Sequence, residues 1–188
     1  LPYFKKSESV EGLDSNFRGD SGPLKLSRST NGNILSQVYL NAAQQAGYQI
    51  NNDMNGKEQE GFGLMDTTIF NGKRQSTSVT YLHPIKHRSN LEILTNVTVN
   101  KILFENKKAV GVECKSNGKN NKYFSTKEIL LSAGAINSPQ LLMLSGIGPE
   151  SELSKHNIEP VECLEGVGKN LQDHLETYVQ YKCKKPVT

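Results

Sequence analysis

Several features that mark particular classes of protein are scarce or missing in this chain. It has no tryptophan and three cysteines, and no two of these cysteines form a CxxC pair. An odd number of cysteines leaves one unpaired in any disulfide scheme, which favours a reducing compartment and structural thiols. The longest apolar run, Leu141 to Leu144, is far shorter than the ~20 residues needed to span a bilayer. The sequence therefore predicts neither a membrane-spanning helix nor a metal site.

Dense runs of basic residues are also missing. The chain has 22 basic and 19 acidic residues, for a net charge of +3. Lysine pairs such as Lys5-Lys6 and Lys107-Lys108 fall in expected turns and at strand edges. This distribution is typical of a solvated surface and argues against nucleic-acid binding. The chain begins at Leu1 rather than Met, so we expect an internal piece of a longer protein.

The first half of the chain predicts loops around one helix. Residues 1–33 are rich in Gly, Ser and Asn and predict irregular structure, with a short extended piece at 24–27. From Ile34 to Ala46 apolar residues recur every four positions, which predicts an amphipathic helix that ends at Gly47. Residues 51–63 return to loop-forming residues.

After Asn90 the pattern becomes typical of strands. Asn106 to Lys108 forms a natural hairpin turn, and the Asn/Lys-rich residues 117–122 predict a second turn. Together these signals predict a small antiparallel meander. Its expected strands are residues 91–94, 99–104, 109–115 and 123–125.

The most informative stretch is a predicted strand, turn and helix. The mostly apolar residues 128–133 predict a strand buried on both faces. The small residues Ala133, Gly134 and Ala135 then let another group approach the backbone closely. A helix N-terminus at the carboxyl end of a buried strand suits a phosphate or another electron-rich group. Tight strand–helix packing is the other interpretation of the same pattern.

Cap signals place the ends of this helix. Asn137 or Ser138 can cap it, and Pro139 suits its first turn, so we expect it to begin at Ser138 or Pro139. Gly146 can close the helix in the left-handed conformation.

Six stretches, two of them overlapping, resemble the glucose–methanol–choline (GMC) oxidoreductases. GAINSPQLLMLSGIG resembles the second signature of this family and covers residues 134–148. Shorter matches are GDSGPL at 19–24, YLHP at 81–84 and GVGKNLQDH at 166–174. DMNGKEQEGFG at 53–63 and LQDHLE at 171–176 are most similar to the choline dehydrogenase branch.

The resemblance implies a fold and an activity. The implied fold is mixed α/β: part of a Rossmann-like FAD-binding domain with the antiparallel meander, plus a segment of the substrate-binding domain. Residues 1–89 would contribute to the substrate side and to the periphery of the FAD domain. Residues 90–188 would form part of the FAD domain and run into the substrate-binding region. The implied reaction is oxidation of choline to betaine aldehyde by hydride transfer to FAD. The alternatives are a family member that oxidises another primary alcohol or a sugar, and a truncated module without catalytic activity.

The resemblance also assigns site residues. The backbone of Val99 is implied to bind the adenine of FAD, although an ordinary core valine explains the residue equally well. Ala133, Gly134 and Ala135 are implied to approach the cofactor. The loop with Asn170, Asp173 and His174 is implied to lie near the active site, or else to cap a helix with polar groups.

Glu176 is implied to bind the substrate. In choline-oxidising members the acidic residue at this position faces the trimethylammonium group, which cannot donate a hydrogen bond and needs a carboxylate and aromatic faces. The chain itself offers few aromatics for such a site. A solvated glutamate on a strand is the alternative.

Other parts of the family's machinery are expected outside this chain. The G-x-G-x-x-G fingerprint for FAD does not occur, and the catalytic histidine of the family comes from a region nearer the C-terminus. We therefore assign no catalytic residue here. We expect that the chain alone does not retain FAD and that it exposes apolar surface along residues 128–133. The electron acceptor cannot be read from this segment. The resemblance implies a mitochondrial location, with a bacterial cytoplasmic or membrane-associated setting as the alternative. None of the four histidines, His174 included, is assigned as the catalytic base. His83 and His87 are expected in a Pro-containing loop and His156 in a polar one, with surface or local hydrogen-bonding roles.

Overall fold

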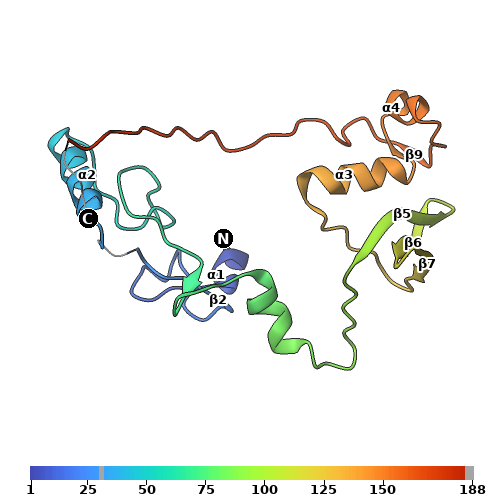
Figure 1. Ribbon diagram of the computed structural model, residues 1–188, viewed down its shortest axis with the longest axis horizontal. Helices are drawn as coiled ribbons and strands as arrows, with labels where there is room; N and C mark the ends of the chain where they lie inside the picture. Colours follow the sequence, from blue (N-terminus) through green and yellow to red (C-terminus); the bar gives the residue numbers. More distant parts are fainter. Residues whose placement is uncertain (30–31, 185–188) are drawn as a thin grey trace. The chain divides into compact units, whose positions relative to one another are not determined.

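The chain folds as a mixture of helices and short strands, as the sequence predicts (Figure 1). The computed structural model describes residues 1–29 and 32–184; residues 30, 31 and 185–188, which three of the predicted ranges include (1–33, 1–89 and 90–188), lie outside it. The chain divides into two compact units, Leu1–Ile93 and Leu94–Thr188. Within the described residues, no helix has the length and apolar character needed to cross a bilayer.

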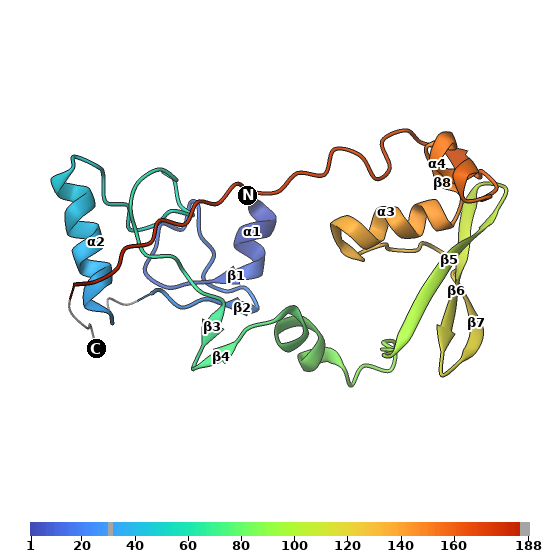
Figure 2. The same ribbon diagram turned by 45° about the horizontal axis from the view of Figure 1, so that its top comes forward.

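The first unit contains short elements joined by long loops (Figure 2). Strands β1 and β2 pair in parallel, and β3 and β4 form an antiparallel hairpin. The described strands are β1 (Glu8–Ser9), β2 (Leu24–Lys25), β3 (Ile69–Phe70) and β4 (Lys73–Arg74). The helical elements are α1 (Pro2–Ser7), α2 (Ile34–Gln45), a π-helical turn η1 (Ser78–Leu82) and a 3-10 turn η2 (His83–Ile85).

Helix α2 confirms the predicted amphipathic helix. The Asn33 side chain accepts a hydrogen bond from the Leu35 backbone N–H at 2.8 Å and so caps the first turn. Gly47 has a φ of +87°, and its N–H donates to the Gln44 carbonyl at 3.0 Å. A residue without Cβ adopts this left-handed conformation without steric cost, which is why the helix ends here.

Two predictions for the first unit are wrong. Residues 2–7 form helix α1 rather than a loop, because Pro2 has a φ suited to the first helical position, where no N–H is needed. His83 lies in η2 and His87 in the turn that follows, rather than in a loop. Pro84 favours this helical turn for the same reason as Pro2.

The buried centre of the first unit is ionic. Arg18 is 3% exposed, and its guanidinium donates to Glu8 at 3.0 Å, to Asp66 at 3.0 Å and to Asp53. Asp66 also pairs with Arg28 at 3.4 Å. Burial by itself lowers the pKa of Arg18, but the hydrogen bonds to Glu8 and Asp66 outweigh it and raise that pKa. Arg18 thereby joins β1 to the loops that carry Asp53 and Asp66, which lie 35 and 48 residues after Arg18 in the sequence.

The second unit contains the predicted meander. Its three antiparallel strands are β5 (Val97–Glu105), β6 (Lys108–Ser116) and β7 (Lys119–Phe124), in that order across the sheet. Both hairpin turns have two central residues with positive φ: Asn106 and Lys107 in the first, Asn117 and Gly118 in the second. This is the geometry of type I′ turns, which match the twist of the flanking strands.

The limits of the meander differ from the prediction in two places. Residues 91–94 form no strand, because β5 begins to pair with β6 only at Val97, opposite Ser116, and no strand in the described part of the chain lies beside the earlier residues. Residues 119–122 are the start of β7 rather than part of a turn. The two-residue turn is complete at Gly118, so pairing resumes at once between Ser116 and Lys119.

Helix α3 (Gly134–Leu144) packs on β5, and a small parallel crossover follows it (Figure 1). Strands β8 (Ile147–Gly148) and β9 (Glu162–Cys163) pair in parallel, and helix α4 (Glu150–Lys155) lies in the connection between them. Ser145 is fully buried and joins α3 to the sheet. Its hydroxyl donates to the Leu141 carbonyl at 2.6 Å and accepts from the Ile102 N–H at 2.8 Å.

The predicted strand at residues 128–133 is wrong for the described structure. The segment is assigned no strand, and Leu130 is 83% exposed. A strand buried on both faces requires a neighbouring strand and covering helices, and no described strand pairs with this segment. Its exposed apolar surface agrees with what we expect of this segment without those neighbours.

Helix α3 also begins earlier than predicted. Gly134 has a φ of +90°, which lets the chain turn into the helix directly after Ala133. Asn137, Ser138 and Pro139 therefore lie inside the helix, and neither polar residue is its N-cap. The Ser138 hydroxyl still accepts the Ala133 N–H, at 3.0 Å. The end of the helix is as predicted, with Gly146 at a φ of +88°.

Candidate functional site

An open groove of about 600 Å³ lies in the second unit, with Val99 on one wall and Ala133 on another. The structure therefore brings together two of the residues that the sequence singled out. The first wall is strand β5, the second the segment before α3, and the third a face of α3. The residues that line this groove, the edge-strand groove, are Val97, Thr98, Val99, Leu130, Leu131, Ser132, Ala133, Asn137, Gln140, Leu141 and Leu144.

Val99 lies on an exposed edge of the sheet. Among the described strands, β5 pairs with β6 only, and Val99 itself is 40% exposed. The register shifts between Val99 and Lys101, which marks a β-bulge at Asn100. An edge strand keeps unpaired backbone groups, and a bulge leaves its additional residue out of the ladder. Backbone N–H and C=O groups here are thus free to bind a ligand beside an apolar side chain.

The turn at Ala133, Gly134 and Ala135 is open. A Cβ added to Gly134 would meet no atom within 4 Å, so glycine is required for its positive φ rather than for space. The first N–H groups of a helix have no partner inside it. Pro139 has no N–H, so it donates nothing to the Ala135 carbonyl one turn earlier. The start of α3 therefore has N–H donors and a carbonyl acceptor that the helix itself does not pair, and Ala133, the residue before it, lines the edge-strand groove.

A second groove, of about 500 Å³, has Asn170 in its lining together with residues on a neighbouring face of the start of α3. Asn170 has a φ of +57°, a left-handed conformation that asparagine tolerates well. Gln140 lines both grooves. The residues of this second groove are Ala135, Ile136, Pro139, Gln140, Met143, Gly168, Lys169, Asn170, Leu171 and Gln172.

Asp173, His174 and Glu176 line neither groove. They lie exposed on the extended segment that follows β9. The Asp173 carboxylate accepts the His174 backbone N–H at 2.8 Å. The structure therefore brings Asn170 close to the turn at Ala135 and leaves the other three outside.

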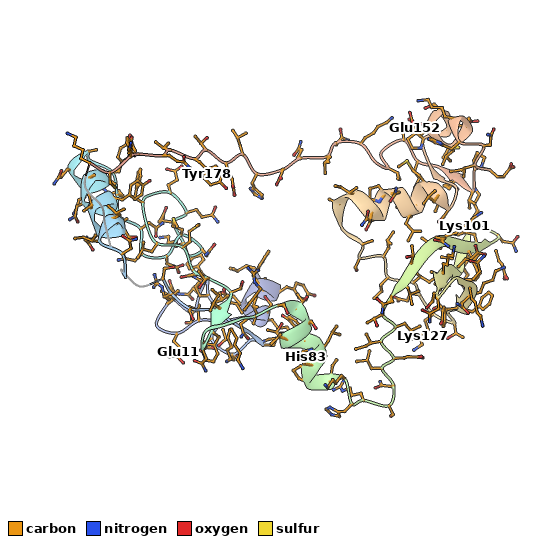
Figure 3. The ribbon with its side chains drawn as sticks, viewed as in Figure 1. Glu11, His83, Lys101, Lys127, Glu152 and Tyr178 are labelled. Carbon is orange, nitrogen blue, oxygen red and sulfur yellow. The ribbon has the colours of Figure 1, made fainter. Side chains whose placement is uncertain are left out.

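Glu176 has a partner that the sequence interpretation missed. The Tyr178 hydroxyl donates a hydrogen bond to the Glu176 carboxylate, and this bond raises the pKa of Tyr178 (Figure 3). The signal was present in the sequence, because side chains two residues apart on an extended segment point to the same side.

The four histidines are all exposed: His83, His87, His156 and His174. Among the described residues, no group of three or more His, Cys, Asp or Glu side chains could hold a metal ion.

The chemistry of the edge-strand groove fits a flat heteroaromatic ring. Apolar side chains such as Val97, Val99 and Leu131 can cover the faces of such a ring, while backbone groups and the Asn137 and Gln140 amides can bind its edge. The adenine of a dinucleotide is a ring of this kind.

The whole chain is similar to known flavin-family proteins. The GMC oxidoreductase family model matches residues 1–176, and the chain belongs to that family. It is 52% identical to the mitochondrial choline dehydrogenase of Homo sapiens over 189 residues, which cover 100% of this chain and 32% of the relative. It is 50% identical to the oxygen-dependent choline dehydrogenase of Staphylococcus saprophyticus, over 100% of this chain and 34% of the relative.

A solved structure supports the same fold. The FAD-dependent oxidoreductase from Chaetomium thermophilum superposes with a TM-score of 0.83 at 32% identity, over 92% of this chain and 32% of that one. This chain thus spans only about a third of the length of its relatives.

Proposed function

We propose that this chain is part of an FAD-dependent alcohol oxidoreductase that oxidises choline to betaine aldehyde. The observation that carries the proposal is identity of 50% or more, along the full chain, to choline dehydrogenases from two distant organisms. The edge-strand groove supports it, because its lining suits the ring of a dinucleotide cofactor.

The cofactor side of the proposal rests on three features of the second unit. The Val99 backbone binds the adenine of FAD, supported by the edge position of β5 and the adjacent bulge. Ala133, Gly134 and Ala135 approach the cofactor, supported by the open turn at Gly134. When bound, FAD supplies the acceptor for a hydride from the alcohol carbon. The chain's own residues bind and orient it.

The substrate side rests on the segment after β9. The Glu176 carboxylate binds the trimethylammonium group of choline by charge, since that group offers no N–H donor. Asn170, Asp173 and His174 lie near the active site in this proposal. Asn170 has the most structural support, because it shares a groove with Ala135.

The two segments of the chain take different roles in this proposal. Residues 1–89 contribute to the substrate side and the FAD-domain periphery, and residues from 90 onward form part of the FAD-binding domain and run into the substrate-binding region. A mitochondrial location is supported by the human relative, and the staphylococcal relative supports a bacterial one. Subcellular fractionation of the source organism distinguishes the two.

Anaerobic flavin reduction tests the activity. The whole protein, expressed from its complete coding sequence, should co-purify with a yellow flavin that choline bleaches. The 188-residue chain expressed alone serves as the control and should retain no flavin, because it carries no three-glycine pyrophosphate fingerprint. A colourless whole protein would contradict the cofactor. Flavin that glucose bleaches and choline does not would contradict the substrate.

Glu176→Gln in the whole protein tests the substrate contact. The variant keeps the shape of the side chain and removes its charge, so choline binding should weaken by about 1–3 kcal/mol. The loss should appear in KM, because the cationic group is remote from the reacting carbon and is bound in both ground and transition states. The neutral isostere 3,3-dimethylbutan-1-ol should lose little. Equal losses for both alcohols would show that Glu176 is structural.

A further inference from the structure

The extended segment after β9 carries a carboxylate that is already held by a neighbour. Glu176 and Tyr178 lie two residues apart, so their side chains share one side of the segment. The Tyr178 hydroxyl donates to Oε2 of Glu176. None of the ion pairs among the described residues includes Glu176, so Oε1 has no cationic partner there. Figure 3 shows Tyr178 on this segment.

The contact restricts a side chain that is otherwise free to move. Both residues are exposed, with Tyr178 at 80%, so packing does not fix the Glu176 rotamer. A long side chain ordered only on binding must lose its rotamer entropy at that moment, and ordering it beforehand improves affinity. A hydrogen bond to an ionised acceptor is stronger than a neutral one. The same bond raises the pKa of Tyr178, so its hydroxyl remains protonated and able to donate.

We propose that Tyr178 is a positioning residue for Glu176: its hydroxyl holds one carboxylate oxygen and leaves the other turned toward a quaternary ammonium group. The inference rests on the proposed function, in which Glu176 binds the cation of choline. Tyr178 acts through Glu176 and contacts neither the reacting carbon nor the flavin. It sets the affinity for a cationic alcohol over a neutral one of the same shape.

Steady-state kinetics of the whole holoenzyme test this role. Tyr178→Phe removes only the hydroxyl and should raise KM for choline about three- to tenfold, the loss typical of one hydrogen bond, with kcat unchanged. KM for 3,3-dimethylbutan-1-ol should stay the same. Tyr181→Phe is the matched control, because Tyr181 is an exposed tyrosine on the same segment; it should change neither constant.

The double variant separates the outcomes. Added to Glu176→Gln, Tyr178→Phe should cause no further loss with choline, because the charge that it positions is gone. If Glu176→Gln is selective for choline and Tyr178→Phe is silent, the positioning role is wrong and the proposed function stands. Equal losses of Tyr178→Phe with both alcohols also overturn the role. If Glu176→Gln itself shows no selectivity, the substrate contact in the proposed function is what fails.

Discussion

Replacing Ser145 with alanine should destabilise the packing of α3 on β5. Ser145 is 0% exposed, and its hydroxyl accepts the Ile102 N–H at 2.8 Å. Ile102 is itself buried, so in the Ser145→Ala variant water cannot replace the lost acceptor. The Leu141 carbonyl is less affected, because the Ser145 backbone N–H also donates to it, at 3.1 Å. The change therefore leaves one buried donor unpaired.

An unpaired buried backbone donor costs about 1–3 kcal/mol, so we expect a loss near the middle of that range. Urea unfolding of the whole protein, followed by circular dichroism, should show a lower midpoint. Hydrogen exchange gives a local reading, since the Ile102 amide should exchange faster. Ser154→Ala is the matched control: Ser154 is exposed on α4, and its loss should stay within about 0.5 kcal/mol.

An unchanged midpoint together with unchanged protection of the Ile102 amide would mean that the hydroxyl contributes no net stability. The contact between α3 and β5 would then rest on apolar packing alone.

Three further experiments test other parts of the structure. Arg18→Gln removes the cation shared by three carboxylates and should lower the free energy of chemical unfolding by about 3–5 kcal/mol. Lys155→Met breaks an exposed pair and should lower it by less than about 1 kcal/mol. Similar losses for the two variants would show that the buried network is weak. Gly146→Ala and Gly47→Ala both place a Cβ at positive φ, a cost of about 1–2 kcal/mol each, but only at Gly146 would the Cβ meet a carbonyl oxygen, at 2.6 Å. Gly146→Ala should therefore lower the unfolding midpoint more, and equal shifts would refute the clash. The hydrogen bond and charge of Lys155 lower the pKa of Glu152. This pair therefore stabilises the fold at pH values above the ordinary carboxyl pKa, and its contribution is lost as the pH falls through the lowered pKa of Glu152. Lys155→Met should raise the Glu152 pKa in an NMR titration, and an unchanged pKa would mean that the contact is absent in solution.

Local chemistry explains the elements that could be predicted from the sequence. Asn33 and Gly47 bound α2 because a cap and a left-handed residue act within one turn of helix. Asn117 and Gly118 end a strand because both accept positive φ. The family is also readable from the chain itself, since the signature at residues 134–148 needs only the order of its residues.

Tertiary contacts decided the rest. Whether residues 128–133 form a strand depends on partners that lie elsewhere, since a ladder needs a second backbone. Arg18 is an ordinary arginine in the sequence, and only folding brings Glu8, Asp53 and Asp66 around it.

The site divides in the same way. Val99, Ala133 and Glu176 were identified from residue order, because family motifs are local. That Val99 and Ala133 share a groove, and that a bulge lies beside Val99, depends on pairing between β5 and β6 and on packing of α3. The packing of α3 on β5 joins residues as far apart in sequence as Ile102 and Ser145, and the energies of such contacts depend on distances that residue order does not contain.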